Sequence, residues 1–387
     1  MSSMKIFTRD FSLNFFAQFV SSFVFCILIP TFPIFLSRLG SKEAEIGVLV
    51  GALSVASLII RPFVGRALFK ISEKKFMIAG NFLCVVSSIA YLIAPPFWPL
   101  LAVRVVQGIG AAFFSTASFT LIANITPETN RGQILSYFYL SINVAFALAP
   151  YFGILLINYF DFNVLFLVCT GLSLCGLFIT LKLGEREIEP PSQPSIKDQA
   201  FLSHEALPAS IMAFLVNIIW GALTAFFPLY ALSYGVDNPG LFFAAFAIML
   251  ILGRAFGGKI LDIYSREKIM FPCLIAYIVA MFILAFSTTL PMFILVAVIW
   301  GMGNAFLYPT MVLYAIDRAG LSKGPAIATF TAIADLGGGI GSVIMGIILQ
   351  LSSYRMMFLC LVITGTLNFL YFYFFVRKKG GDGHAHL

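Results

Sequence analysis

Charged side chains are scarce in this sequence. Only 11% of its 387 residues are Asp, Glu, Lys or Arg, whereas 60% are hydrophobic. A soluble globular chain carries about 25% charged residues, so a single protein core could not bury this much apolar surface. The scarcity of charge excludes an ordinary soluble fold and indicates a chain whose solvent is the lipid bilayer.

Histidine and catalytic motifs are equally scarce. The three histidines, His204, His384 and His386, lie outside the apolar runs, and no paired carboxylates, GxSxG motif or Walker loop occurs. The glycines of QGIGAA (107–112) follow no predicted strand, as a nucleotide-binding loop would require. We therefore expect no enzymatic activity and no cofactor. The two histidines near the C-terminus could touch a metal, but a solvated chain end is the better interpretation, so no metal site is expected.

Cysteine is present without any of its motifs. The six cysteines form no CxxC pair and no ligand cluster, and all lie in apolar runs: Cys26, Cys84, Cys169, Cys175, Cys273 and Cys360. They are expected to be small buried hydrophobes, and no disulfide framework is expected.

Long apolar runs are what the sequence has in abundance. Twelve runs of about 20 residues can be drawn, six on each side of a polar segment. None shows the alternation of a barrel strand. The sequence predicts an all-α integral membrane protein with twelve transmembrane helices, the first over 11–36 and too long for a signal-peptide core. Its expected parts are two six-helix bundles, a cytoplasmic linker and a cytoplasmic tail, at 1–183, 208–376, 184–207 and 377–387 respectively.

The positive charges are distributed asymmetrically. Of the 24 Lys and Arg residues, all but four fall in loops of one side; Arg38, Lys42 and Arg355 are placed outside and Arg104 within a helix. This asymmetry predicts that both termini are cytoplasmic. It also explains the net charge of +7 without a nucleic-acid partner.

One basic stretch occurs twice. RPFVGRALFKISEKK (61–75) matches RAFGGKILDIYSREK (254–268) when the first is shifted by 193 positions. The same shift carries QGIGAA onto WGMGNA (300–305) and Gly153 onto Gly346. The chain is therefore expected to be two halves of common ancestry.

Two charges are placed well inside predicted spans, Arg104 in the fourth helix and Asp335 near the middle of the eleventh. An intramembrane charge costs several kcal/mol and is by default a functional-site hypothesis. A structural ion pair, or an arginine that snorkels outward, is the alternative for Arg104. Asp335 could carry a proton, because a carboxylate is cheaper to bury neutral. It precedes a run of glycines, so it could instead serve a close helix crossing.

Polar residues form stripes at helical spacing on four repeat-related helices. The stripes are Asn14, Gln18, Ser21 and Ser22; Arg104, Gly108, Ala111, Ser115 and Ser118; Asn217, Gly221 and Thr224; and Gly301, Asn304 and Tyr308. They predict a water-filled substrate cavity lined by the first, fourth, seventh and tenth helices, with polar contacts between packed helices as the alternative. The candidate cavity residues are Asn14, Gln18, Ser22, Gln107, Asn217, Trp220, Trp300, Asn304 and Tyr308.

These motifs together resemble the major facilitator superfamily, in particular its bacterial twelve-helix branch of proton-linked permeases and drug or metabolite exporters. The two basic stretches resemble the family's loop between helices 2 and 3 and its echo between helices 8 and 9. RVVQGIG (104–110) resembles the helix 4 motif, Arg131-Gly132 the pair that opens helix 5, and ADLGGGIG (334–341) a helix 11 signature of arabinose-efflux-like members. The resemblance implies conformational gate loops containing Arg61, Gly65, Arg66, Arg131, Arg254, Gly258 and Asp262, and ties Arg104 to proton coupling.

The sequence departs from the family pattern in two places. Phe69 stands where the first loop normally has an Asp, although the second copy keeps it as Asp262, so the first gate is expected to be weaker. The exporter motif of helix 5 normally has several glycines around its proline, whereas here it has Ala145, Ala149-Pro150 and Gly153.

The resemblance implies alternating access by two bundles around a midplane site. A proton-coupled exporter of a small organic molecule is the first interpretation. A proton-coupled importer or facilitator of a metabolite or siderophore is the second, and a non-transporting receptor the third. Arginine with aromatics suits an amphiphilic or anionic compound. The expected partners are the lipid bilayer, protons and the substrate, and the protein is expected to be a monomer in the bacterial inner membrane.

Overall fold

The computed structural model describes residues 8–68, 70–126, 131–185, 203–319 and 323–377. Side chains at 131–133, 135–136, 254–262, 319 and 323–325 are outside this description. Within the described residues the chain forms twelve long helices and no strand, as the sequence predicts.

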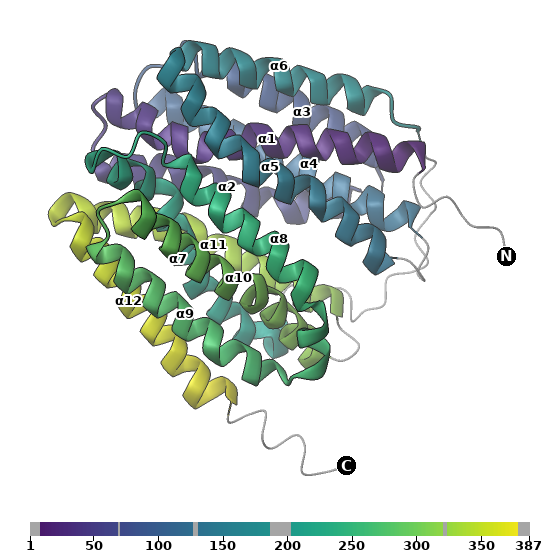
Figure 1. The fold of residues 1–387 in the computed structure, drawn as a ribbon. Helices are drawn as coiled ribbons and strands as arrows, with labels where there is room; N and C mark the ends of the chain where they lie inside the picture. The colour runs from purple at the N-terminus through teal and green to yellow at the C-terminus, as the bar shows by residue number, and fades with distance from the viewer. Residues whose placement is uncertain (1–7, 69, 127–130, 186–202, 320–322, 378–387) are drawn as a thin grey trace, which may run out of the picture. The chain divides into compact units, whose positions relative to one another are not determined.

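The first six helices precede the polar linker (Figure 1): α1 (Arg9–Arg38), α2 (Glu43–Ala67), α3 (Glu73–Ala90), α4 (Trp98–Ile125), α5 (Arg131–Tyr159) and α6 (Phe162–Leu181). After a short 3-10 turn, η3 (His204–Ala206), the second six follow: α7 (Leu207–Ser233), α8 (Gly240–Ile263), α9 (Arg266–Phe286), α10 (Leu290–Ala319), α11 (Lys323–Leu351) and α12 (Tyr354–Tyr371). A π-helical turn, η4 (Phe372–Val376), extends α12.

Helix boundaries follow local chemistry. Asp161 caps α6, because its Oδ1 accepts a hydrogen bond from Val164 N at 2.9 Å. Pro99 stands in the first turn of α4, where the absence of an N–H costs nothing. The first helix passes through Pro30 and Pro33 and continues to Arg38, two residues beyond its expected end.

Ten of the helices, counted over the described residues, are long and apolar enough to cross a membrane. The α3 helix falls short by this measure because Glu73, Lys74 and Lys75 occupy its first turn and count as three charges. The α8 helix also falls short, because only its apolar segment Gly240–Gly253 could be assessed. The side chains that follow this segment are not described.

Packing divides the chain into two compact units, residues 1–41 with 52–191, and residues 42–51 with 192–387. The start of α2 thus packs with the second unit. Ala44 N donates to Gln350 Oε1 on α11 at 3.3 Å, and a Cβ on Gly51 would lie 2.6 Å from Gly339 O. In the first unit, an apolar core joins α1, α3 and α4 around Met77, Phe114 and Leu121.

The duplicated glycines make equivalent helix crossings in the two halves. A Cβ on Gly108 would meet Leu53 O and Ala56 Cβ of α2, and a Cβ on Gly301 would meet Phe246 O and Met249 Cβ of α8. Positions 53 and 56 become 246 and 249 under the 193-residue shift.

The second glycine of each motif repeats the correspondence on the next helix. Gly110 faces Gly80 O and Leu83 Cβ on α3, whereas Gly303 faces Cys273 O and Ala276 Cβ on α9. The shift again relates these contacts atom by atom, so QGIGAA and WGMGNA serve close backbone approach.

Candidate functional site

A buried arginine lies in the first half of α4. The sequence predicts that this half faces the outer side of the membrane. Arg104 is the seventh residue of the helix and is only 6% exposed. Its Nη1 donates to Gln107 Oε1, one turn along the same helix, at 2.9 Å. Tyr91 is the residue directly after α3, and its hydroxyl donates to the same oxygen at 2.6 Å. Gln107 therefore holds the arginine and the tyrosine together.

An aromatic ring lies against the other side of this cation. The Arg104 guanidinium carbon lies 3.7 Å from the centroid of the Phe32 ring on α1. A desolvated cation–π contact contributes about 2 kcal/mol, and a hydrogen bond to a charged group contributes about 1.5–3 kcal/mol. These contacts offset part of the cost of burying the charge and fix where it points. Arg104 is thus a positioned cation that can attract an anionic group or respond to a proton nearby.

The polar stripe of α1 is largely bonded within the first unit. Asn14 and Ser118 exchange two hydrogen bonds, Asn14 Nδ2 to Ser118 O at 3.0 Å and Ser118 Oγ to Asn14 Oδ1 at 2.8 Å. Ser118 Oγ also lies 3.0 Å from Gln18 Oε1, and Gln18 Nε2 donates to Ser22 Oγ at 2.9 Å. In this structure these four residues tie α1 to α4, which is the alternative that the sequence left open for them.

Ser21, from the same stripe, bonds a different helix. Its Oγ donates to Asn81 Oδ1 on α3 at 3.0 Å, and Asn81 Nδ2 donates to Thr180 Oγ1 on α6 at 2.9 Å. Asn81 and Thr180 are almost completely buried. Ser21 lies two turns after Asn14 and so on nearly the same face of α1, but its hydroxyl bonds α3 whereas Asn14 bonds α4. Sequence reasoning missed Asn81, whose one signal was a lone amide in an apolar run.

The stripe of α7 bonds to its own helix. Asn217 Nδ2 donates to Ala213 O at 2.9 Å, and Thr224 Oγ1 donates to Trp220 O at 3.0 Å. Asn217 and Trp220 are half-buried. On α10, the Tyr308 ring packs edge-on against Phe330 of α11, with centroids 5.5 Å apart.

Rings from four helices meet around Trp300. Trp300 of α10 is 1% exposed, and its ring centroid lies 4.1 Å from that of Phe246 on α8 and 5.7 Å from that of Trp220 on α7. Tyr277 of α9 completes the group at 6.3 Å. The structure thus brings two predicted cavity residues, Trp220 and Trp300, into one aromatic cluster.

Asp335 is half-buried in α11, beside the glycines that face α7. A Cβ on Gly341 would lie 2.5 Å from Ile218 O, and one on Gly337 would meet Phe214 O. A Cβ on Gly221 of α7 would in turn clash with Gly338 O of α11. The glycine run after Asp335 therefore serves this crossing.

The predicted gate residues are described only in part. Arg61 is half-buried, Arg66 is exposed, and Gly65 has open space where a Cβ would be. Phe69 lies outside the described residues, and so do the surroundings of Gly258 and the side chains of Arg131, Arg254 and Asp262.

No group of three His, Cys, Asp or Glu side chains that could hold a metal occurs among the described residues. All six cysteines are free, and three are buried as expected: Cys26, Cys169 and Cys273. Cys175, which was expected to be buried, is exposed on α6.

Comparison with known proteins identifies relatives over most of the chain. A family model described as Major Facilitator Superfamily matches residues 15–320 and 239–386. Staphylopine export protein of Staphylococcus aureus (strain Mu50 / ATCC 700699) is 27% identical, over 83% of this chain and 84% of that protein. Quinolone resistance protein NorA of Staphylococcus aureus (strain COL) is 23% identical, over 83% of this chain and 84% of that protein. The crystal structure of nucleoside transporter NupG superposes with a TM-score of 0.77 at 14% identity, covering 94% and 98% of the two chains, and so supports the fold.

Proposed function

Because the chain belongs to the Major Facilitator Superfamily and is a multi-pass transporter of the bacterial plasma membrane, we propose that it is a proton-coupled exporter of a small organic molecule. Transport rather than catalysis is its activity in this proposal. Both termini face the cytoplasm, the protein acts as a monomer, and the substrate crosses by alternating access.

The observation that carries export is the similarity, over more than four fifths of the chain, to a protein named for staphylopine export. NorA, named for quinolone resistance, is a second relative of the same kind. The crossing of α1 and α5 agrees with this interpretation despite the missing glycines. Ala145 and Ala149 are completely buried, and a Cβ on Gly153 would lie 2.9 Å from Ile27 O.

Two intramembrane charges are assigned to the coupling. Asp335 takes up and releases the proton, since a neutral carboxyl group is much cheaper to hold at membrane depth than a carboxylate. Arg104 stays charged, held by Gln107 and Phe32, and attracts the anionic or polar end of the substrate.

Metabolite profiling of cells and medium, with and without the gene, tests the direction. A compound that accumulates inside the deletion strain establishes export and identifies the substrate. A compound that the deletion strain leaves in the medium establishes import and overturns the proposal.

Proteoliposomes with an imposed pH gradient test the coupling. Asp335→Asn is expected to abolish gradient-driven uptake of the identified compound while folded protein remains in the membrane. Asp161→Asn is the matched control, because Asn caps a helix as well as Asp does and the position is exposed. Unchanged coupling in Asp335→Asn rules out the assigned role.

A further inference from the structure

A tyrosine from a neighbouring helix end holds the polar group around Arg104. The Tyr91 hydroxyl donates to Gln107 Oε1 at 2.6 Å, and Arg104 Nη1 donates to the same oxygen at 2.9 Å. Arg104 also lies within side-chain hydrogen-bonding reach of the Tyr91 hydroxyl itself. All three side chains are buried. We call Tyr91, Arg104 and Gln107 the Arg104 triad.

The Tyr91 ring is enclosed by rings from two other helices. It stacks on Phe166 of α6, with centroids 5.2 Å apart, and packs against Phe32 of α1 at 5.4 Å. Phe166 is held in turn by Phe35 of α1 at 5.0 Å. Because α1 and α6 fix the ring, the hydroxyl that it carries has a fixed place. Tyr91 is therefore a rigid support for the other two members of the triad.

Phe32 connects these rings to the cation itself. The Arg104 guanidinium carbon lies 3.7 Å from the centroid of the Phe32 ring, which is the ring that also packs against Tyr91. The guanidinium is thus held on its face by Phe32 and at Nη1 by Gln107, and both of these residues contact Tyr91. A guanidinium is planar and its N–H donors point in fixed directions. Fixing its face and one nitrogen therefore fixes the direction of its other donors.

The second half of the chain packs the equivalent positions without such a triad. The 193-residue shift carries the three members of the triad onto Leu284, Ala297 and Trp300. These side chains are all buried, beside the equivalent glycine crossings. The repeated helices therefore pack here without a cation and without its two partners. Since burying an arginine at membrane depth costs free energy, a role in packing does not account for the triad.

We propose that Tyr91 is a positioning residue for substrate binding, which holds Gln107 and Arg104 so that the guanidinium meets an anionic group of the substrate in one orientation. The inference rests on the proposed transport function and deepens it. Gln107 Oε1 already accepts two hydrogen bonds, so the amide has only its NH2 group left to offer, and a guanidinium has no acceptor. A carboxylate, which only accepts, suits both.

Chemical labelling of Arg104 tests the positioning before the substrate is known. Phenylglyoxal modifies guanidinium groups, and peptide mass spectrometry of the protein in nanodiscs measures the labelling rate at each arginine. Tyr91→Phe keeps the ring and removes the hydroxyl, so it is expected to raise the rate at Arg104 about 2- to 10-fold, the loss of one hydrogen bond. The exposed Arg355 of the second unit is the internal standard, and its rate is expected to stay the same.

Tyr230→Phe is the matched control. The Tyr230 hydroxyl is buried in the second unit and donates to Ser287 O at 2.6 Å, the same distance as in the triad. Both variants are expected to lower the melting temperature by a similar amount, but only Tyr91→Phe is expected to change the labelling of Arg104. An unchanged rate in Tyr91→Phe, or an equal increase in Tyr230→Phe, overturns the proposal.

A double variant tests whether Tyr91 acts through Gln107. Gln107→Leu alone is also expected to raise the labelling rate of Arg104. Because Tyr91 and Arg104 share one oxygen of Gln107, the combination of Tyr91→Phe with Gln107→Leu is expected to raise the rate by less than the product of the two single effects. Effects that simply multiply would show that the two residues act independently and would overturn the proposal.

Transport kinetics separate this proposal from the function on which it rests. In proteoliposomes with the compound that metabolite profiling identifies, Tyr91→Phe is expected to raise KM about 2- to 10-fold with little change in kcat, because it weakens substrate binding. Faster labelling with an unchanged KM overturns the role in substrate binding. Faster labelling in a protein whose deletion alters no metabolite would refute the proposed export and leave the positioning of Arg104 by Tyr91 standing.

Discussion

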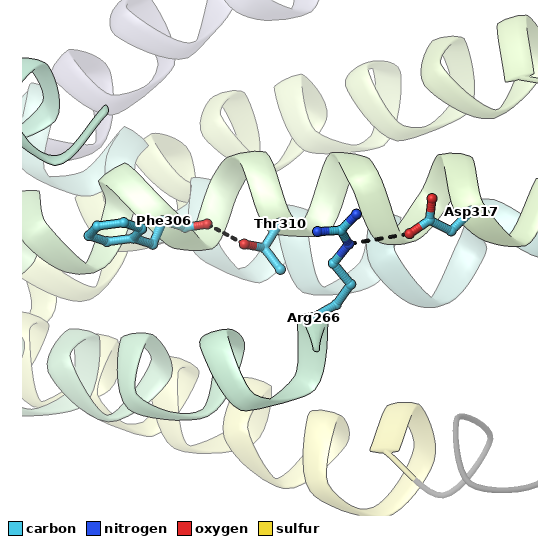
Figure 2. A network of polar contacts seen from close by, with 4 residues as sticks. All are labelled: Arg266, Phe306, Thr310 and Asp317. Carbon is cyan, nitrogen blue, oxygen red and sulfur yellow. Dashed lines mark hydrogen bonds and ion pairs between the residues drawn. The ribbon is translucent and has the colours of Figure 1, made fainter. Parts of the chain in front are cut away.

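Arg266 Nε donates to Asp317 Oδ2 at 3.3 Å and so joins the start of α9 to the end of α10 (Figure 2). The positions 193 residues earlier hold Glu73 and Asn124, and Asn124 Nδ2 donates to Glu73 Oε1 at 2.7 Å. The same contact therefore joins α3 to α4, with the carboxylate on the opposite helix. The place of the interaction is shared by the two halves, whereas its chemistry is not.

Asn124→Asp would set two carboxylates against each other at this contact. We expect a lower melting temperature. The unfolding free energy should fall by only about 0.5–1 kcal/mol, because the contact is partly exposed. Adding Glu73→Arg rebuilds the pair of the second half and is expected to restore the melting temperature in a thermal unfolding assay. If the double variant is no more stable than Asn124→Asp alone, the two contacts are not equivalent.

The glycine crossings predict a contrast between two Gly→Ala substitutions. Gly110→Ala places a Cβ 2.9 Å from Gly80 O, where a backbone must move, and is expected to cost about 1–3 kcal/mol of unfolding free energy. Gly171→Ala, in α6 with open space around it, is expected to be neutral or to stabilise by up to about 1 kcal/mol. Chemical denaturation in detergent measures both. Equal stability of the two variants would mean that the crossing can relax.

Arg104→Lys keeps the charge but loses the planar group that bonds Gln107 and stacks on Phe32. We expect transport of the identified substrate to fall at least 10-fold, on the order of 1.4 kcal/mol or more, with little change in the amount of folded protein. Arg38→Lys is the control, because its guanidinium lies over Phe162 at 5.2 Å in an exposed position. Normal transport by Arg104→Lys would mean that transport requires only the positive charge at this position, not the planar guanidinium.

Asn81→Leu removes the amide that links α1 to α6 through α3. The hydroxyls of Ser21 and Thr180 each lose a partner, so we expect a loss of about 1–3 kcal/mol in unfolding free energy. The exposed Asn163→Ala is expected to change it by less than about 0.5 kcal/mol. A melting temperature that is the same for Asn81→Leu and the wild type would assign the amide no stabilising role.

The fold could be predicted because membrane helices are set by length and polarity. The predicted first helix, 11–36, differs from α1 by two residues at each end. The α3 helix begins before its apolar run, because it includes the charged first turn Glu73 to Lys75, and it ends at Ala90. Charged side chains can lie in a helix whose first turn reaches the membrane surface, which a hydropathy pattern does not reveal.

The candidate site could be predicted only in its residue types. Spacing indicated which helices carry polar groups, but not whether Asn14 would bond Ser118 or a substrate. Tyr91 was missed because a tyrosine in an apolar run is indistinguishable from core until its hydroxyl is placed. Hydrogen-bond partners depend on helix rotation, and a shift of one residue changes them entirely.

The paired glycine crossings have a consequence for how this protein can evolve. An added Cβ at Gly108, Gly110 or Gly301 would force a neighbouring helix to shift, and Gly303 leaves only slightly more room. The residue just before each motif's first glycine is held by side-chain contacts instead of backbone contacts, and it is Gln107 in one half and Trp300 in the other. Substitutions of such side chains can therefore change which substrate is transported, while the helix crossings stay the same. A fitness map of all single substitutions would separate these two classes of position within one short motif.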